Sequence, residues 1–276
     1  MSEPRGRGVS HNGAADRFAM CSGGMDSVAM THYMMEQWES EQKRPVVVYL
    51  ETGVGLSSQR LYVDLLCDHY AWQLWKLRTH EDFDEHSQEQ GFYGPQQHSK
   101  IFNRLKGRQI DKLTTVSGNP HLYFGTRRAE SDNRSDIETE RWNDSYRAWV
   151  HNPIAEWSDE EVVEYLREQE IPINPNWQGH HPTDCACGAT ASREELIELE
   201  AEGYEAFAEK LRNLENGVKT GDRREVWAWG SFEPKERQWL DADRDKGQQQ
   251  LCDIVCGPNC SGRSKLAELT DGGDSA

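Results

Sequence analysis

Residues 22–27, SGGMDS, form a short glycine- and serine-rich run between an apolar segment and a stretch with helical spacing. Two glycines let the backbone approach a ligand closely, and the start of a helix offers free N–H groups to an anion. Asp26 alone would repel a phosphate, but it suits the Mg²⁺ that accompanies bound phosphates. The run therefore predicts a phosphate-binding loop, although it lacks the GK[ST] ending of the Walker pattern.

Five of the seven cysteines gather in two tight clusters toward the C-terminus: Cys185, Cys187, Cys252, Cys256 and Cys260. Four thiolates around one centre suit a tetrahedral Zn²⁺ or a [4Fe–4S] cluster, so these five are the candidate metal ligands. Their spacings, C-x-C and C-x₃-C-x₃-C, differ from the common C-x₂-C of zinc sites. The odd total, with no visible export signal, argues against a disulfide framework and predicts a reducing, cytoplasmic compartment.

The elements around the loop alternate between strand and helix. Apolar, β-branched runs predict strands, and a period of 3.6 residues predicts the helices between them. The predicted strands are 17–21, 45–50, 73–77, 121–125 and an extended segment 149–153. One predicted helix starts at Asp26, and the others cover 57–70, about 100–113, 158–168 and about 192–212. A loop is expected over 81–99. This order favours an α/β fold, a Rossmann-like parallel sheet with helices on both faces and ligands at the carboxyl ends of the strands.

Composition divides the chain into four parts. We expect a polar lead-in at 1–16, a nucleotide-binding domain at 17–180, a small Cys-rich metal- or cluster-binding region at 181–269, and a loose tail at 270–276. The main boundary falls in the Pro- and Gly-rich segment 171–184. No apolar run approaches the roughly 20 residues that span a bilayer, so no membrane partner is expected.

The chain is acidic throughout, with 31 Lys and Arg against 48 Asp and Glu and a net charge of −17 over 276 residues. This charge argues against a general nucleic-acid-binding surface but leaves room for a local groove. Two explanations stay open. The protein is either an ordinary acidic cytoplasmic protein or a halophilic one, whose carboxylates keep the surface hydrated where salt screens their repulsion.

Two groups of basic side chains are candidates for binding anions. Arg127, Arg128 and Arg134 follow the fourth predicted strand, and a guanidinium group matches phosphate or sulfate, with Glu130 to orient one of them. A second stretch is suited to the approach of an anionic substrate: His98, Lys100, Arg104 and Lys106. For both groups a solvated charged surface is the alternative.

Four ordered motifs resemble one known family. Residues 22–27 are similar to the PP-loop motif SGGxDS, 51–53 (ETG) to a DTG element with Glu in place of Asp, 125–134 to G.R..ES..R, and 152–162 to P…W…DV. Over about residues 17–180 they resemble the 3′-phosphoadenosine-5′-phosphosulfate (PAPS) reductase family of the PP-loop ATP pyrophosphatase superfamily. That family includes sulfonucleotide reductases, the small subunit of ATP sulfurylase and DNA phosphorothioation sulfurtransferases.

The resemblance implies an adenine nucleotide alpha hydrolase-like fold that binds ATP, or PAPS or its unphosphorylated relative APS, together with Mg²⁺. Carried over motif by motif, the nucleotide-binding residues are Ser22, Gly23, Gly24, Asp26, Ser27, Glu51, Thr52, Gly53, Gly125, Arg127, Glu130, Ser131 and Arg134. The expected catalytic residues are Asp26, Arg127 and Arg128. Because several PP-loop sulfur enzymes carry a [4Fe–4S] cluster, the resemblance favours that cluster over Zn²⁺ at the cysteines.

The activity expected first is adenylation of a substrate with pyrophosphate release, as part of sulfur transfer. A PAPS or APS reductase is the second expectation, although the chain ends SKLAELTDGGDSA and lacks the ECGLH-like nucleophilic tail of those enzymes. The third, from another class, is a non-catalytic nucleotide-binding accessory protein with a structural zinc. Nucleic acid, through residues 219–224, Trp227 and Trp229, and a sulfur carrier stay open as acceptors, although core packing is the favoured explanation for the two tryptophans. The oligomeric state also stays open.

Overall fold

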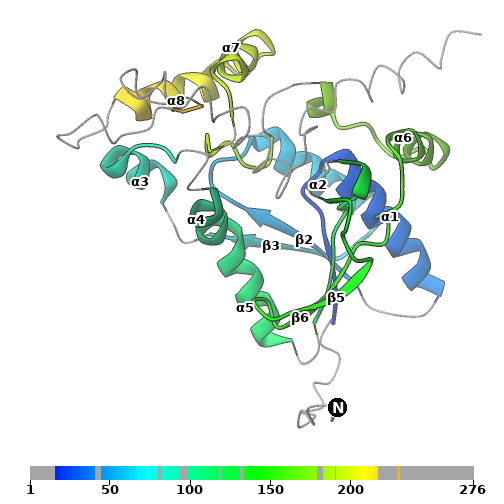
Figure 1. Cartoon of the computed structure of the whole chain (residues 1–276). Helices are drawn as coiled ribbons and strands as arrows, with labels where there is room; N and C mark the ends of the chain where they lie inside the picture. The colour runs from blue at the N-terminus through cyan, green and yellow to red at the C-terminus, as the bar shows by residue number, and fades with distance from the viewer. Residues whose placement is uncertain are drawn as a thin grey trace, which may run out of the picture.

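A mixed sheet organises the molecule, with strand order β3–β2–β1–β4–β6–β5 (Figure 1). The computed structural model describes residues 16–40, 45–79, 82–93, 98–117, 120–130, 134–178, 183–189, 191–216 and 229–230. The strands are β1 (Arg17–Met20), β2 (Val46–Glu51), β3 (Leu74–Arg78), β4 (His121–Tyr123), β5 (Glu140–Asn143) and β6 (Ala148–His151). All neighbours run parallel except β5, which pairs antiparallel with β6 at the edge. The predicted α/β fold is confirmed.

Helices cover both faces of this sheet, and a further group lies together away from it (Figure 1). Their bounds are α1 (Met25–Ser40), α2 (Ser57–His69), α3 (Phe83–Gln90), α4 (His98–Phe102), α5 (Arg108–Val116), α6 (Asp159–Glu168), α7 (Arg193–Ala201) and α8 (Glu205–Asn216). A π-helical turn, Asn103–Gly107, joins α4 to α5, and two 3₁₀ turns occupy Arg128–Glu130 and Pro175–Gln178. The group away from the sheet consists of α3, α7 and α8.

Strand β2 shows how the sequence builds two layers. Its run VVVYLE is buried on both faces, as a central parallel strand requires. Val46 and Val48 pack in one cluster with residues of α5, whereas Val47 and Tyr49 pack in another with α1, α2 and α6. Alternate side chains of a strand point to opposite faces, so one apolar run serves two cores.

A third core lies around residues 183–189, outside the sheet. It joins the turn after β2 to α3, α4, α7 and α8, and it contains Ala186, Cys187 and the fully buried Trp229. Trp229 Nε1 donates to the carbonyl of Ala186 at 2.8 Å. A Cβ on Gly188, which has φ +83°, would lie 2.7 Å from Trp229 Cδ1, so only glycine allows this close approach. Trp229 is therefore a core residue and not a surface for stacking bases.

The predicted start of α6 is confirmed in atomic detail. Ser158 Oγ accepts from Glu161 N at 3.1 Å, and Ser158 N donates to Glu161 Oε2 at 2.7 Å. This reciprocal capping box satisfies two backbone donors that a helix start leaves unpaired. A second capping box, between Ser192 and Glu195, starts α7.

Three elements differ from the sequence-based prediction. The segment expected as a loop contains α3, whose start is capped by Asp82 Oδ1 accepting from Glu85 N at 3.0 Å. The single helix expected over 192–212 is two helices, because the chain turns at Gly203 with φ +90°. Strand β5 was not predicted, since its residues are mostly exposed and carry no alternating apolar pattern.

No helix within the described ranges is long and apolar enough to cross a membrane. The expected tail, and the expected lead-in apart from Asp16, lie outside the described residues.

Candidate functional site

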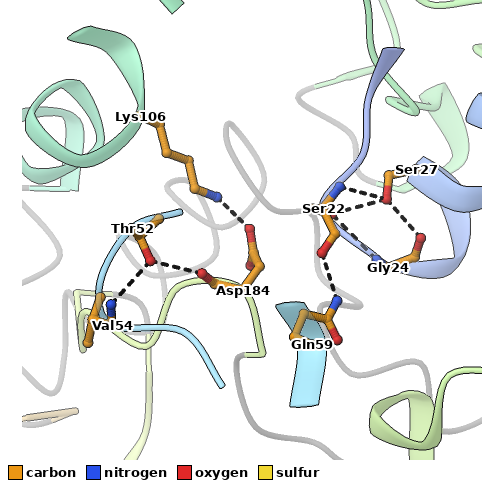
Figure 2. Close-up of polar contacts among 8 residues, drawn as sticks. All are labelled: Ser22, Gly24, Ser27, Thr52, Val54, Gln59, Lys106 and Asp184. Carbon is orange, nitrogen blue, oxygen red and sulfur yellow. Dashed lines mark hydrogen bonds and ion pairs between the residues drawn. The ribbon is translucent and has the colours of Figure 1, made fainter. Parts of the chain in front are cut away.

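The loop between β1 and α1 is held by hydrogen bonds of its own serine hydroxyl groups. Ser22 N donates to Ser27 Oγ at 3.2 Å, Ser27 Oγ donates to Gly24 O at 2.9 Å, and the two serine hydroxyls lie 3.1 Å apart (Figure 2). The helix α1 begins at Met25, inside the predicted run. The loop thus joins a buried strand to a helix start, which is the arrangement that offers backbone N–H groups to an anion.

A cavity of about 840 Å³ opens beside this loop. Its wall includes residues at or near the carboxyl ends of the central strands, such as Met20 and Leu50, where parallel sheets bind ligands. Of the predicted nucleotide-binding residues, six line it: Ser22, Gly24, Asp26, Ser27, Gly125 and Arg134. The volume lies within the range of small-molecule sites, about 300–1,000 Å³. These six residues come from separate motifs, which the fold brings to one place.

The charged side chains of the cavity are mixed in sign. The basic ones are Lys106, Arg134 and Arg141, and the acidic ones are Asp26, Asp136, Glu138 and Asp184. Cations suit phosphate or sulfate, and carboxylate oxygens are the donors that Mg²⁺ prefers. The donor set therefore fits a nucleotide bound with Mg²⁺. Arg141, Asp136, Glu138 and Asp184 were not singled out from the sequence, because they belong to no motif.

Arg127 is fully buried and does not line the cavity. Its Nε lies 3.0 Å from Asp26 Oδ1, its Nη2 lies 2.6 Å from Asp159 Oδ1, and its Nη1 donates to Trp157 O at 3.1 Å. Burial acts to lower the pKa of Arg127, but the carboxylates of Asp26 and Asp159 outweigh it and raise the pKa. Arg127 thus joins the first turn of α1 to that of α6, behind the loop.

Arg128 also binds to a neighbouring segment of the chain, around Ile137, and does not line the cavity. Its Nε and Nη2 donate to Ile137 O at 3.0 and 2.8 Å, and its Nη1 forms an ion pair with Glu156. Ile137 lines the cavity, so Arg128 fixes part of its wall. Glu130 ends the 3₁₀ turn after β4, and Ser131 lies outside the described residues. The catalytic roles expected for the two arginines stay predictions.

The ETG element at the end of β2 contacts the segment that precedes Cys185, and its own three residues do not line the cavity. Glu51 pairs with Arg60 at 2.8 Å. Thr52 Oγ1 donates to Asp184 O at 3.0 Å and accepts from Val54 N at 3.4 Å (Figure 2). Gly53 takes φ +79°, a conformation that favours glycine. The element therefore connects β2 to the segment with the first two candidate metal ligands.

Only one member of the second basic stretch reaches the cavity. Lys106 Nζ donates to Asp184 Oδ2 at 2.6 Å, and both residues line the wall (Figure 2). Arg104 Nη1 donates to Tyr93 OH at 3.2 Å and does not line it. Lys100 is exposed outside the cavity, and His98 is buried in α4.

Burial of His98 makes folding sensitive to acid. Burial, and secondly the charge of Lys106, lower the pKa of His98 from 6.5 to about 4. Since the folded state resists protonation, the stability that neutral His98 provides is complete above pH 6.5 and is lost as the pH falls toward 4. We expect His98→Leu to make the fall in unfolding free energy between pH 6.5 and 4 shallower, measured by urea denaturation. His69→Leu, at an exposed position, is the control, and equal slopes in both variants and the wild type would contradict this account.

Cys185 and Cys187 are held against the turn after β2. Leu56 N donates to Thr183 O at 2.8 Å, and Ala186 N donates to Val54 O at 2.9 Å. The hydrogen bond from Cys185 lowers the pKa of Cys187, against the burial that would raise it. The pKa of Cys185 is raised by the same bond and by burial.

Two neighbouring thiols that interact with each other fit half of a four-cysteine site. The other three candidates, Cys252, Cys256 and Cys260, lie outside the described residues. Within the described ranges, no three His, Cys, Asp or Glu side chains are grouped to hold a metal ion. Cys21 and Cys67 are buried core residues. The metal site stays a prediction.

A buried polar group behind the loop was missed from the sequence. Gln59, Asn174 and Trp177 donate hydrogen bonds to loop carbonyls. One signal was present: Gln59 shares the core face of α2 with Tyr62, Val63 and Leu66, where a polar side chain needs a partner. Asn174 and Trp177 lie in the Pro- and Gly-rich segment that was interpreted only as a boundary.

Sequence comparisons with known proteins agree on one family. The sequence profile of the phosphoadenosine phosphosulfate reductase domain matches residues 17–183. The chain is 36% identical over 143 residues to an adenosine 5′-phosphosulfate reductase of Salinibacter ruber, covering 50% of this chain and 54% of that protein. It is 26% identical over 164 residues to a phosphoadenosine 5′-phosphosulfate reductase of Gloeobacter violaceus, covering 58% and 65%. The chain thus spans between half and two thirds of these relatives' length.

Among solved structures, similarity is limited. A phosphoadenylyl-sulfate reductase of Candida auris in a phosphate complex aligns with a TM-score of 0.43 at 15% identity, covering 58% of this chain and 76% of that one. A Candida glabrata FMN adenylyltransferase with ATP aligns with a TM-score of 0.45 at 12% identity, covering 64% and 54%.

Proposed function

Because the chain belongs to the phosphoadenosine phosphosulfate reductase domain family, we propose that it binds ATP or a related adenine nucleotide at residues 22–27 and adenylates a substrate. The observation that carries the proposal is the cavity, in which the loop, Lys106 and Arg134 lie together at the carboxyl ends of the strands. Triphosphate or phosphosulfate oxygens would accept from the loop amides, and the two cations would offset their charge.

In the proposed reaction, a nucleophilic oxygen of the substrate forms a new bond to the α-phosphorus. The bond between the α-phosphorus and the oxygen that joins it to the β-phosphorus breaks, and pyrophosphate leaves with that oxygen. The chain's own contribution is to hold the leaving phosphates: loop amides and Lys106 would stabilise the charge that develops on them. A Mg²⁺ held by Asp26 or its acidic neighbours would supply further charge neutralisation when bound. The thiol pair would then belong to sulfur transfer on the adenylated product.

A [4Fe–4S] cluster at the cysteines is part of this proposal. Cys185 and Cys187 would supply two of its ligands, and two of the three distal cysteines would supply the rest. When bound, such a cluster supplies a site for handling sulfur or electrons. Zinc is the alternative, and metal analysis with a visible absorption spectrum of anaerobically purified protein distinguishes the two.

Reduction of APS or PAPS is the second candidate, favoured by the names of the relatives in the comparison. Incubation of the purified chain with each nucleotide separates the possibilities. Pyrophosphate release from ATP and Mg²⁺ supports adenylation, and sulfite release from APS or PAPS with a thiol reductant supports reduction. Nucleotide binding without either product, tested across acceptor nucleic acids and proteins, would leave the non-catalytic accessory role.

The site itself is tested by a matched pair of lysines. Lys106→Met is expected to weaken ATP binding about tenfold, because it removes a cavity cation that a phosphate would use. Lys100→Met changes the same residue type six positions earlier in the same basic stretch, but outside the cavity, and should leave ATP affinity unchanged. Calorimetric titration measures both. Equal ATP affinities in the two variants would contradict nucleotide binding in this cavity.

A further inference from the structure

Two backbone carbonyls of the loop are bound by buried side chains. Gln59 Nε2 donates to Ser22 O at 2.7 Å (Figure 2). Asn174 Nδ2 and Trp177 Nε1 both donate to Gly23 O, at 3.0 and 2.8 Å. Gln59 and Asn174 are buried away from the cavity wall, whereas Trp177 also lines it. The two loop carbonyls are therefore held by three side chains, of which Gln59 and Asn174 lie outside the cavity wall.

The amide groups in this set satisfy one another. Gln59 Oε1 accepts from Asn174 Nδ2 and from Asn176 Nδ2, each at 2.8 Å. Asn174 Oδ1 accepts from the backbone N of Asn176 at 3.0 Å. Asn176 Oδ1 accepts from Ser58 Oγ at 3.0 Å and from Tyr204 OH at 2.5 Å. Because backbone partners define which end of Gln59 and of Asn174 is the donor, the direction of the network is determined, and burial strengthens each bond.

Because the peptide unit is planar, the hydrogen bonds to the two carbonyls also determine where the following N–H groups point. In a trans peptide the carbonyl and the following N–H point in opposite directions. With Ser22 O bound to Gln59, the N–H of Gly23 points the other way. Gly23 O is bound to Asn174 and Trp177, so the N–H of Gly24 also points away from these side chains. The contact of Gly24 N with Ser22 Oγ is long, at 3.5 Å. Two consecutive amides are thereby presented away from the network, as an anion requires.

Gly23 is required by the same arrangement. It takes φ +85°, and a Cβ there would lie 2.6 Å from Gln59 Nε2. A side chain would therefore both strain the backbone and displace the donor that holds Ser22 O. The loop sequence and the network behind it specify one conformation together.

We propose that Gln59, Asn174 and Trp177 are positioning residues that keep the loop in its anion-receptive conformation. The inference rests on the proposed function, since it takes the cavity's ligand to carry phosphate or sulfate. Without these donors, the loop peptides could rotate and present carbonyl oxygens to the phosphate, which would repel it.

The test compares ligands with and without phosphate on the full-length chain. Gln59→Glu and Asn174→Asp keep the shape of the side chain, but they place an oxygen against Ser22 O and against Gly23 O, respectively. We expect each variant to bind ATP and inorganic pyrophosphate about tenfold more weakly or worse, with adenosine affinity unchanged. Calorimetric titration measures the affinities, and circular dichroism and thermal unfolding verify folding.

Tyr62→Phe is the control within the same core. The Tyr62 ring packs against Trp177, and its hydroxyl donates to Pro172 O at 2.8 Å without touching the loop. The Tyr62→Phe variant should bind ATP with the affinity of the wild type. Equal losses for ATP and adenosine would show a merely structural effect and overturn the inference, as would full ATP affinity in both folded variants. A wild-type chain that binds neither ATP nor pyrophosphate would instead overturn the proposed function, and this inference with it.

Discussion

Replacing Arg127 with alanine is expected to lower the free energy of unfolding by about 3 kcal/mol, the scale found when one partner of a buried ion pair is removed. The guanidinium is fully buried and holds Asp26 and Asp159 at the starts of α1 and α6. Without it, these two carboxylates lose the cation that lies between them. Urea denaturation at neutral pH measures the loss, and ATP affinity should fall with it because Asp26 belongs to the loop.

Arg128→Ala is the matched control for this experiment. Arg128 is the next residue and also forms an ion pair, but its side chain is 37% exposed and its partner Glu156 is 64% exposed. Exposed pairs contribute about 1 kcal/mol or less, so this variant should lose much less stability. If the two variants lose the same stability, the buried pair at Arg127 is not the organising contact that its geometry indicates.

Gly125→Ala is expected to weaken ATP binding at least about tenfold, because overpacking of this kind costs about 1–3 kcal/mol and acts directly on the loop. A Cβ at position 125 would lie 2.5 Å from Asp26 O and 2.7 Å from Ser27 N. Both atoms are backbone of the first turn of α1, so no side-chain rotation relieves the overlap. The end of β4 and the start of α1 must separate, and the two form adjoining parts of the cavity wall.

Gly24→Ala is the steric control for the fold. A Cβ there would meet only Ser22 Oγ, at 3.6 Å, which is ordinary van der Waals contact. We expect its melting temperature to stay close to that of the wild type, whereas Gly125→Ala should melt at a lower temperature. A Gly125→Ala protein with wild-type melting temperature and ATP affinity would show that β4 and α1 are not in the close contact described.

The secondary structure near the loop could be predicted because local signals agree there. A β-branched run such as that of β2 and a capping box such as Ser158 with Glu161 each specify an element within a few residues. The run at 22–27 likewise indicated a phosphate site through its residue types, and the segment 125–134 did so through its resemblance to a family motif. Helix α3 was missed although Asp82 offers a cap, since the segment around it is polar and has no apolar period to support it.

The roles of individual side chains could not be predicted in the same way. Arg127 and Lys106 are both cations within candidate motifs, yet one is buried between two carboxylates and the other faces the cavity. Which cation is buried depends on the packing of α1 against α6, which joins residues more than 100 positions apart. No local pattern carries that information.

By itself, the amino-acid sequence indicated the family, through the resemblance of its motifs, and the mostly parallel α/β sheet, through short-range patterns of apolar residues, glycines and caps. Only the tertiary structure decided which charged side chains line the cavity and which side chains hold the loop. The donors to its carbonyls come from α2 and from residues 174–177, and Asp184 joins Lys106 to the cysteine segment. Such contacts depend on the distances between folded elements, and chain order does not encode them locally.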